Sequence, residues 1–155
     1  MARVAVSGNK NQDWILDKPK HGGYSENDLI DAYLAGKREQ RDSEKKILIE
    51  RFVSNLNKAK TRGIDFFRFL VAEKQNPKIA YLKIEDISKF QIVFIIPQDV
   101  FVSEGFPVVY SKAREIKQEV NDDTFHISFS FMPFTESINE ERLISDGFIL
   151  RHGQL

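Results

Sequence analysis

The sequence predicts an α+β fold, in which two N-terminal helices precede a mixed or antiparallel sheet of about four to five strands, with two further helices packed on one face. Three observations support this prediction. Apolar residues recur with helical spacing up to residue 62, and residues 125–131 alternate strictly between apolar and polar or small side chains. Strand-type and helix-type segments then alternate through the second half of the chain.

Length and composition fit one domain. The chain has 155 residues, of which 41% are hydrophobic and 13 are Phe, so a large aromatic core can form without disulfides. Gly and Pro are prominent before residue 24, which predicts an irregular N-terminal arm over residues 1–24. We expect a single α+β domain over residues 25–155, with a helical part at 25–62 and a sheet part at 63–155.

The helical part contains two periodic segments. Ser25 and Asp28 form a weak capping box that opens a helix to about residue 35. A second helix is predicted over residues 43–60, and Gly63 is expected to end it in a left-handed cap conformation. The charged stretch between them fits either a loop or an exposed helical connection, so the pattern leaves open whether 25–62 is one helix or two.

Beyond Gly63 the pattern changes to short apolar segments. Residues 64–72 are aromatic and β-branched on both faces, which favours a central strand, although a buried helix also fits. A turn signal at residues 74–77 predicts that 79–84 returns as the antiparallel partner of 64–72. The apolar run at residues 90–96, stopped by Pro97, predicts a buried strand.

The last third gives the clearest pattern. Helical spacing of apolar residues predicts an amphipathic helix from Pro107 to Val120. Alternation predicts a strand over residues 124–132, with Phe125, Ile127, Phe129 and Phe131 in the core. A capping box of Ser137 and Glu140 predicts a short helix to Ser145, closed by Gly147, before a final strand at residues 148–151.

The polar face of the 124–132 strand is the first candidate site. His126, Ser128 and Ser130 project from this face, and Asp123 lies just before the strand. We interpret these four residues as a face that contacts a ligand or partner. Residues two apart on a strand are roughly 6 to 7 Å apart, too far for a direct Ser–His hydrogen bond, so no catalytic residues are assigned.

Metal and cofactor chemistry finds no support in the sequence. The chain has no Cys, and none of its three His residues has metal-ligand spacing relative to another. Adjacent acids occur at the ends of predicted elements, where carboxylates are ordinary. Glycines near residues 8 and 22 lack the spacing of a phosphate-binding loop. We therefore expect no metal site and no cofactor.

Charge is balanced overall but unevenly distributed. The 23 basic and 23 acidic residues cancel, yet residues 36–62 hold nine bases against four acids, and residues 85–146 hold twelve acids against five bases. Contact with a nucleic acid or an acidic surface through the basic segment is one interpretation, and a solvated helix face is favoured over it because acids interrupt the run. The cations of this candidate contact are Lys37, Arg38, Arg41, Lys45 and Lys46.

These observations favour a non-enzymatic intracellular domain for protein interaction or regulation. The absence of Cys, of a signal-peptide pattern and of an apolar run near the roughly 20 residues that span a bilayer predicts a cytoplasmic protein without membrane contact. We expect a protein partner or self-association, and nucleic acid is not favoured. The alternatives are a small enzyme or ligand-binding domain with its site on the polar face of the 124–132 strand, or nucleic-acid contact through residues 37–62.

Overall fold

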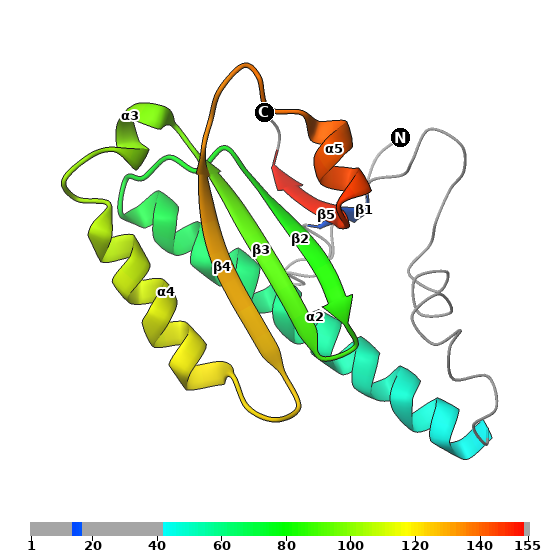
Figure 1. Ribbon diagram of the computed structural model, residues 1–155. Helices are drawn as coiled ribbons and strands as arrows, with labels where there is room; N and C mark the ends of the chain where they lie inside the picture. Colours follow the sequence, from blue (N-terminus) through cyan, green and yellow to red (C-terminus); the bar gives the residue numbers. More distant parts are fainter. Residues whose placement is uncertain (1–13, 17–41, 154–155) are drawn as a thin grey trace, which may run out of the picture.

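The computed structural model describes residues 14–16 and 42–153 (Figure 1). The predicted helix at 25–35 and most of the N-terminal arm lie outside these residues. The described elements, in chain order, are β1 (Ile15–Leu16), α2 (Asp42–Ala72), β2 (Ile79–Asp86), β3 (Lys89–Ile96), α3 (Gln98–Phe101), α4 (Pro107–Val120), β4 (His126–Pro133), α5 (Glu140–Ser145) and β5 (Phe148–Gly153).

The strands form one mixed sheet in the order β1-β5-β2-β3-β4. Neighbouring strands are antiparallel except β3 and β4, which are parallel and pair from Lys89↔His126 to Ile96↔Pro133. Helices and a five-stranded mixed sheet confirm the predicted α+β class. Strand β4 is one edge of the sheet, and this position matters for the site.

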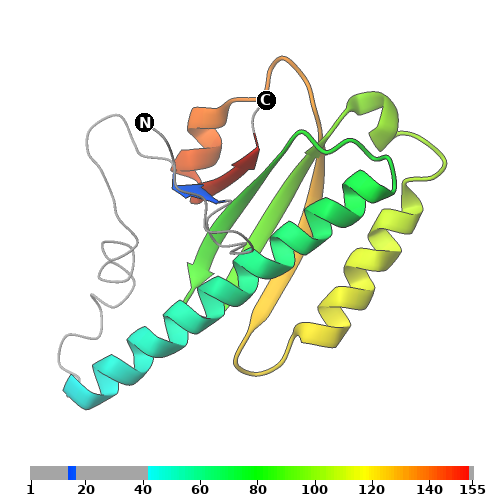
Figure 2. The same cartoon turned by 180° about the vertical axis from the view of Figure 1, so that it is seen from behind.

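Helix α2 crosses one face of the sheet and α4 runs beside the β4 edge, as Figures 1 and 2 show from opposite sides, and apolar residues of both helices pack in one core cluster on this face. We call it the helical face. Its core is largely aromatic, and Phe66 of α2 lies with its ring centroid 4.7 Å from that of Phe129 and 5.1 Å from that of Phe94. The predicted apolar stripe of α4 packs here, with Val109 buried and Ala113 partly buried against the same cluster. Each buried aromatic ring removes a large apolar area from water, which stabilises this face.

The other face carries α5, and we call it the α5 face. Here Ile79, Tyr81, Val93 and Ile95 form a second, smaller cluster, against which Leu143 of α5 packs. The prediction that both later helices lie on one face is therefore wrong. Both β3–β4 and β4–β5 are parallel crossovers, and they move in opposite directions along the sheet. Right-handed crossovers in opposite directions must pass over opposite faces.

The predicted strand at 64–72 is also wrong, because α2 continues without interruption to Ala72. Its buried residues repeat with helical spacing along the whole length of the helix, through Phe52, Leu56, Ala59, Gly63, Phe66 and Leu70. Gly63 does not end the helix. An added Cβ at Gly63 would lie 2.7 Å from Cδ1 of Ile92 and 2.8 Å from Cζ2 of Trp14. Gly63 therefore lets α2 approach closely to Ile92 of β3 and to Trp14.

Since 64–72 is helical, the predicted hairpin with 79–84 does not form. Strand β2 pairs instead with β3 on one side and with β5 on the other. The strands predicted at 90–96, 124–132 and 148–151 and the helix at 107–120 are confirmed within a few residues. The short helix is also present, but its cap is Asn139, whose side chain accepts from the Arg142 N–H. The predicted capping role of Ser137 is therefore wrong, and its hydroxyl lies 2.9 Å from that of Thr135.

The N-terminal strand is anchored by Trp14, which is buried against α2. Its indole Nε1 donates to the Lys60 carbonyl at 3.0 Å, and its ring lies 5.8 Å from that of His152 on β5. Within the predicted irregular arm, Ile15 and Leu16 thus form a short strand, because β5 offers them a free edge.

Candidate functional site at the foot of strand β4

The two faces of β4 carry different side chains. Ile127, Phe129 and Phe131 belong to the core of the helical face, as the alternation predicts, and Phe125 just before the strand is fully buried. His126 is exposed and Ser128 is partly exposed on the α5 face. The period of two along a strand produces this division.

Among the described residues, apolar packing covers the half of the α5 face that lies toward the C-terminal end of β4. Met132, Phe134 and Leu143 pack on the second cluster near the C-terminal end of β4. Towards the N-terminal end of β4, the pairing register places Gln91 beside Lys83 on one side and beside Ser128 on the other. The lower half of this face is thus polar.

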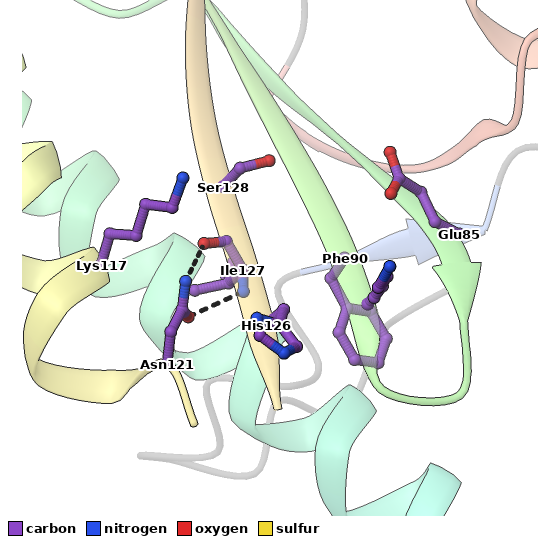
Figure 3. Close-up of a pocket in the computed structure, with 8 residues that line it drawn as sticks. Glu85, Phe90, Lys117, Asn121, His126, Ile127 and Ser128 are labelled. Carbon is purple, nitrogen blue, oxygen red and sulfur yellow. Dashed lines mark hydrogen bonds between the residues drawn. The ribbon is translucent and has the colours of Figure 1, made fainter. Parts of the chain in front are cut away.

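A hollow of about 250 Å³ lies at this polar end, the N-terminal end of β4, which we call the foot of β4 (Figure 3). Its lining combines backbone and side chains from β2, β3, α4 and β4. The lining residues are Glu85, Lys89, Phe90, Lys117, Asn121, His126, Ile127 and Ser128. The alternation of β4 predicts His126 and Ser128 at a candidate site, and both line this hollow.

Three basic residues from three elements line the hollow. Lys89 begins β3, Lys117 comes from the last turn of α4, and His126 begins β4. All three are exposed, and Glu85 is the one acid among the described residues of the lining. Figure 3 shows Lys117 on the outer side of β4 and Glu85 beyond β3. The hollow therefore carries an excess of positive charge suited to an anionic group.

Asn121 fixes the wall of the hollow where α4 ends. Its side-chain amide donates to the Ile127 carbonyl at 3.1 Å and accepts from the Ile127 N–H at 2.9 Å. The amide thus bonds the N–H and the C=O of Ile127, which point away from β3, as a neighbouring strand would (Figure 3). These bonds hold the last turn of α4, and with it Lys117, beside β4.

The other two predicted site residues lie outside the lining. Ser130 is on the same face of β4, and its hydroxyl is 3.5 Å from the Ile92 carbonyl. Asp123 is exposed in the turn before β4. Its neighbour Asp122 organises that turn, since its Oδ1 accepts from the N–H and the hydroxyl of Thr124 and from the Phe125 N–H. These bonds, led by the Thr124 hydroxyl, hold the pKa of Asp122 below its ordinary value.

The predicted basic contact is only partly described. Lys45 and Lys46 are exposed in the first turns of α2, and this end of the helix extends beyond the sheet in Figures 1 and 2. Lys37, Arg38 and Arg41 lie outside the described residues. Lys45 and Lys46 are not part of the lining of the hollow at the foot of β4.

Residues 14–16 and 42–153 contain no group of three His, Asp or Glu residues placed to hold a metal ion. Within the same residues, no helix is long and apolar enough to cross a bilayer. Family models, curated proteins and solved structures were all compared with the chain, and none matches it.

Sequence reasoning missed Lys89, Lys117 and Asn121 as members of the site. Lys89 is brought next to His126 by the parallel register of β3 and β4, which the linear pattern does not specify. A signal for the other two was present, because Lys117 and Asn121 stand four apart on a helix and so share one side of it. That side is next to the stripe of apolar residues that marks the buried face.

Proposed function

We propose that this protein is a non-enzymatic intracellular interaction domain, and that the hollow at the foot of β4 binds an acidic segment of a partner protein. One observation carries the proposal: Lys89, Lys117 and His126 reach a single open hollow from three different elements. The Ser128 hydroxyl and the Asn121 amide add neutral polar groups that can orient a carboxylate.

The exposure of Lys89 and Lys117 sets the kind of binding expected. Exposed ion pairs contribute about 0.2 to 1 kcal/mol each and are screened by salt. Charge pairing at the hollow therefore supports weak, reversible and salt-sensitive docking. Specificity then depends on the spacing of acids along the partner, which suits a regulatory contact.

The test uses a short fluorescein-labelled peptide that alternates Glu and Val, with a peptide that alternates Gln and Val as its matched control. Fluorescence anisotropy measures binding at about 20 mM and about 300 mM salt, where screening differs strongly. We expect the Glu peptide to bind more tightly than the Gln peptide, with an affinity that falls as salt rises.

Two double variants locate the binding site. Lys89→Gln with Lys117→Gln is expected to weaken binding about tenfold, since losing two pairs of about 0.7 kcal/mol each removes about 1.4 kcal/mol. Lys45→Gln with Lys46→Gln, which removes the same charge from the projecting end of α2, is expected to leave binding unchanged. Equal binding of both peptides, loss of binding only in the Lys45/Lys46 variant, or tighter binding of a single-stranded oligonucleotide of equal charge would contradict the proposal.

A further inference from the structure

The outer edge of β4 exposes backbone groups. In the parallel register with β3, the His126 N–H donates to the Ser88 carbonyl and the Phe134 N–H donates to the Ile96 carbonyl. Even-numbered residues of β4 therefore direct their backbone groups toward β3. The odd-numbered residues of β4 direct theirs outward, away from the sheet.

At each end of this outer edge, a backbone group is not available to pair with another strand. Asn121 bonds both outward groups of Ile127, and Pro133 has no N–H to donate. Between them lie Phe129 and Phe131, whose outward N–H and C=O groups bond no described residue. The edge thus offers two donors and two acceptors in a short row, which is a template for pairing with another strand.

Helix α4 runs beside this edge and sets its charge. Tyr110 lies against Phe131, with ring centroids 5.2 Å apart, and Asn121 bonds to Ile127. Arg114 and Lys117 stand between Tyr110 and Asn121 at helical spacing on the same side of α4, and both are exposed. Lys117 also lines the hollow at the foot of β4. An aromatic ring and two cations therefore border the edge, which complements an acidic strand.

A second copy of this chain does not fit the edge. Paired strands lie about 4.8 Å apart, whereas packed helices need about 8 to 10 Å between their axes. Because α4 packs beside β4 at the edge (Figures 1 and 2), pairing two β4 edges about a two-fold axis would force two α4 helices into the same space. An extended segment without its own helix avoids this clash.

We infer that an extended acidic segment of a partner protein binds as an added antiparallel strand on the edge of β4, bonded to Phe129 and Phe131. This inference rests on the proposed function and specifies how the partner binds. In this pairing, partner residues whose N–H and C=O face β4 direct their side chains to the helical face, against α4. The alternate residues direct theirs to the α5 face, where acidic side chains meet the hollow.

The test uses the whole protein and two modified forms of the Glu/Val peptide. One form is N-methylated at the Val residues and the other at the same number of Glu residues, so charge and side chains stay the same. In the inferred pairing, the Val N–H groups face β4 and the Glu N–H groups face solvent. We expect methylation at Val to weaken binding at least tenfold and methylation at Glu to leave it within about twofold, because only the first removes bonds to the edge.

Amide hydrogen exchange gives a second measurement on the unmodified protein and peptide. Saturating peptide is expected to slow exchange of the Phe129 and Phe131 amides, because both would then be bonded. Unchanged exchange at both residues, or equal binding of the two methylated peptides, would overturn strand addition while leaving charge-driven docking in place. Failure of the unmodified Glu/Val peptide to bind at all would overturn both proposals.

Discussion

The two faces of the sheet differ most sharply at the foot of β3 and β4. On the helical face, Phe90 and Ile127 are buried in the aromatic core. On the α5 face at the same level, Lys89 and His126 are exposed beside an open hollow. Neighbouring residues of one strand thus pack in the core on one side and lie at the hollow on the other, so we expect stability and the proposed binding to be altered independently by substitution.

The largest effect is expected in the core of the helical face. Phe66 is 1% exposed and its ring lies within 6 Å of four other Phe rings, those of Phe69, Phe94, Phe129 and Phe131. Phe66→Ala should lower the free energy of unfolding by about 3 to 5 kcal/mol in urea denaturation, because a large cavity remains. Ser128→Ala on the α5 face should change it by less than about 0.5 kcal/mol. Similar losses of unfolding free energy in the two variants would show that the two faces contribute equally to stability.

A smaller effect is expected where α2 is tied to the foot of the sheet. The Asn55 side chain is 5% exposed and donates to the carbonyls of Ile87 and Thr124, at 3.1 and 3.0 Å. Asn55→Ala leaves both acceptors without this donor and should cost about 1 to 3 kcal/mol of unfolding free energy. Asn57→Ala, at an exposed position of the same helix, is the matched control and should be nearly neutral. Equal stability of the two variants would show that the hydrogen bonds of Asn55 do not stabilise the fold.

The close contact at Gly63 gives the next effect. Gly63→Ala adds a methyl group within 3 Å of Ile92 and Trp14, and the strain of about 1 to 3 kcal/mol exceeds the helix propensity gain of about 1 kcal/mol. We expect a net loss of up to about 2 kcal/mol in thermal or urea unfolding. Gly105→Ala is the control, because a Cβ there would meet nothing within 4 Å. A stabilised Gly63→Ala protein would mean that α2 lies farther from β3 than described.

The smallest effect concerns the turn from α4 into β4, whose hydrogen bonds are accepted by Asp122. Hydrogen bonds from Thr124 and Phe125 lower the pKa of Asp122, so the ionised carboxyl stabilises the folded state. This contribution is present above the ordinary value of 3.8 and is lost as the pH falls through the lowered folded value. Asp122→Asn should therefore be less stable than the wild type at neutral pH, by a difference that shrinks in acid.

Urea denaturation of both proteins from pH 7 down to about pH 2 measures this difference across the titration range of a carboxyl group. Asp123→Asn is the matched control, since Asp123 accepts none of the bonds that Asp122 accepts from Thr124 and Phe125. A difference between wild type and Asp122→Asn that stays constant with pH would contradict the role of the ionised carboxyl.

The sequence predicted those elements that have one buried face and one exposed face, because their apolar residues then repeat with a clear period. The strict alternation at 125–131 identified β4 and its two faces, and the spacing from Val109 to Val120 identified α4. The prediction was wrong at residues 64–72. In this part of α2, residues beside the buried stripe are also apolar, because Trp14, His152 and α4 contact the helix from other sides. Gly63 then looked like a helix end, although it serves close packing.

Two residues of the candidate site followed from the pattern of one strand, and Lys89 and Lys117 required the sheet order. His126 and Ser128 are on one face by local alternation alone, which needs no tertiary information. Lys89 and Lys117 join them only because β3 and β4 are parallel neighbours connected through α4. Such pairing depends on contacts that are distant in sequence, so one chain without related sequences does not specify it.

The most direct test of the central claim is a titration of the isotope-labelled protein with the Glu/Val peptide, followed by amide chemical shifts. We expect the largest shift changes at the foot and outer edge of β4 and in the last turns of α4, at Lys89, Lys117, Ser128, Phe129 and Phe131. The projecting end of α2 around Lys45 should not change. Shifts concentrated at that end of α2, with β4 unaffected, would contradict the account.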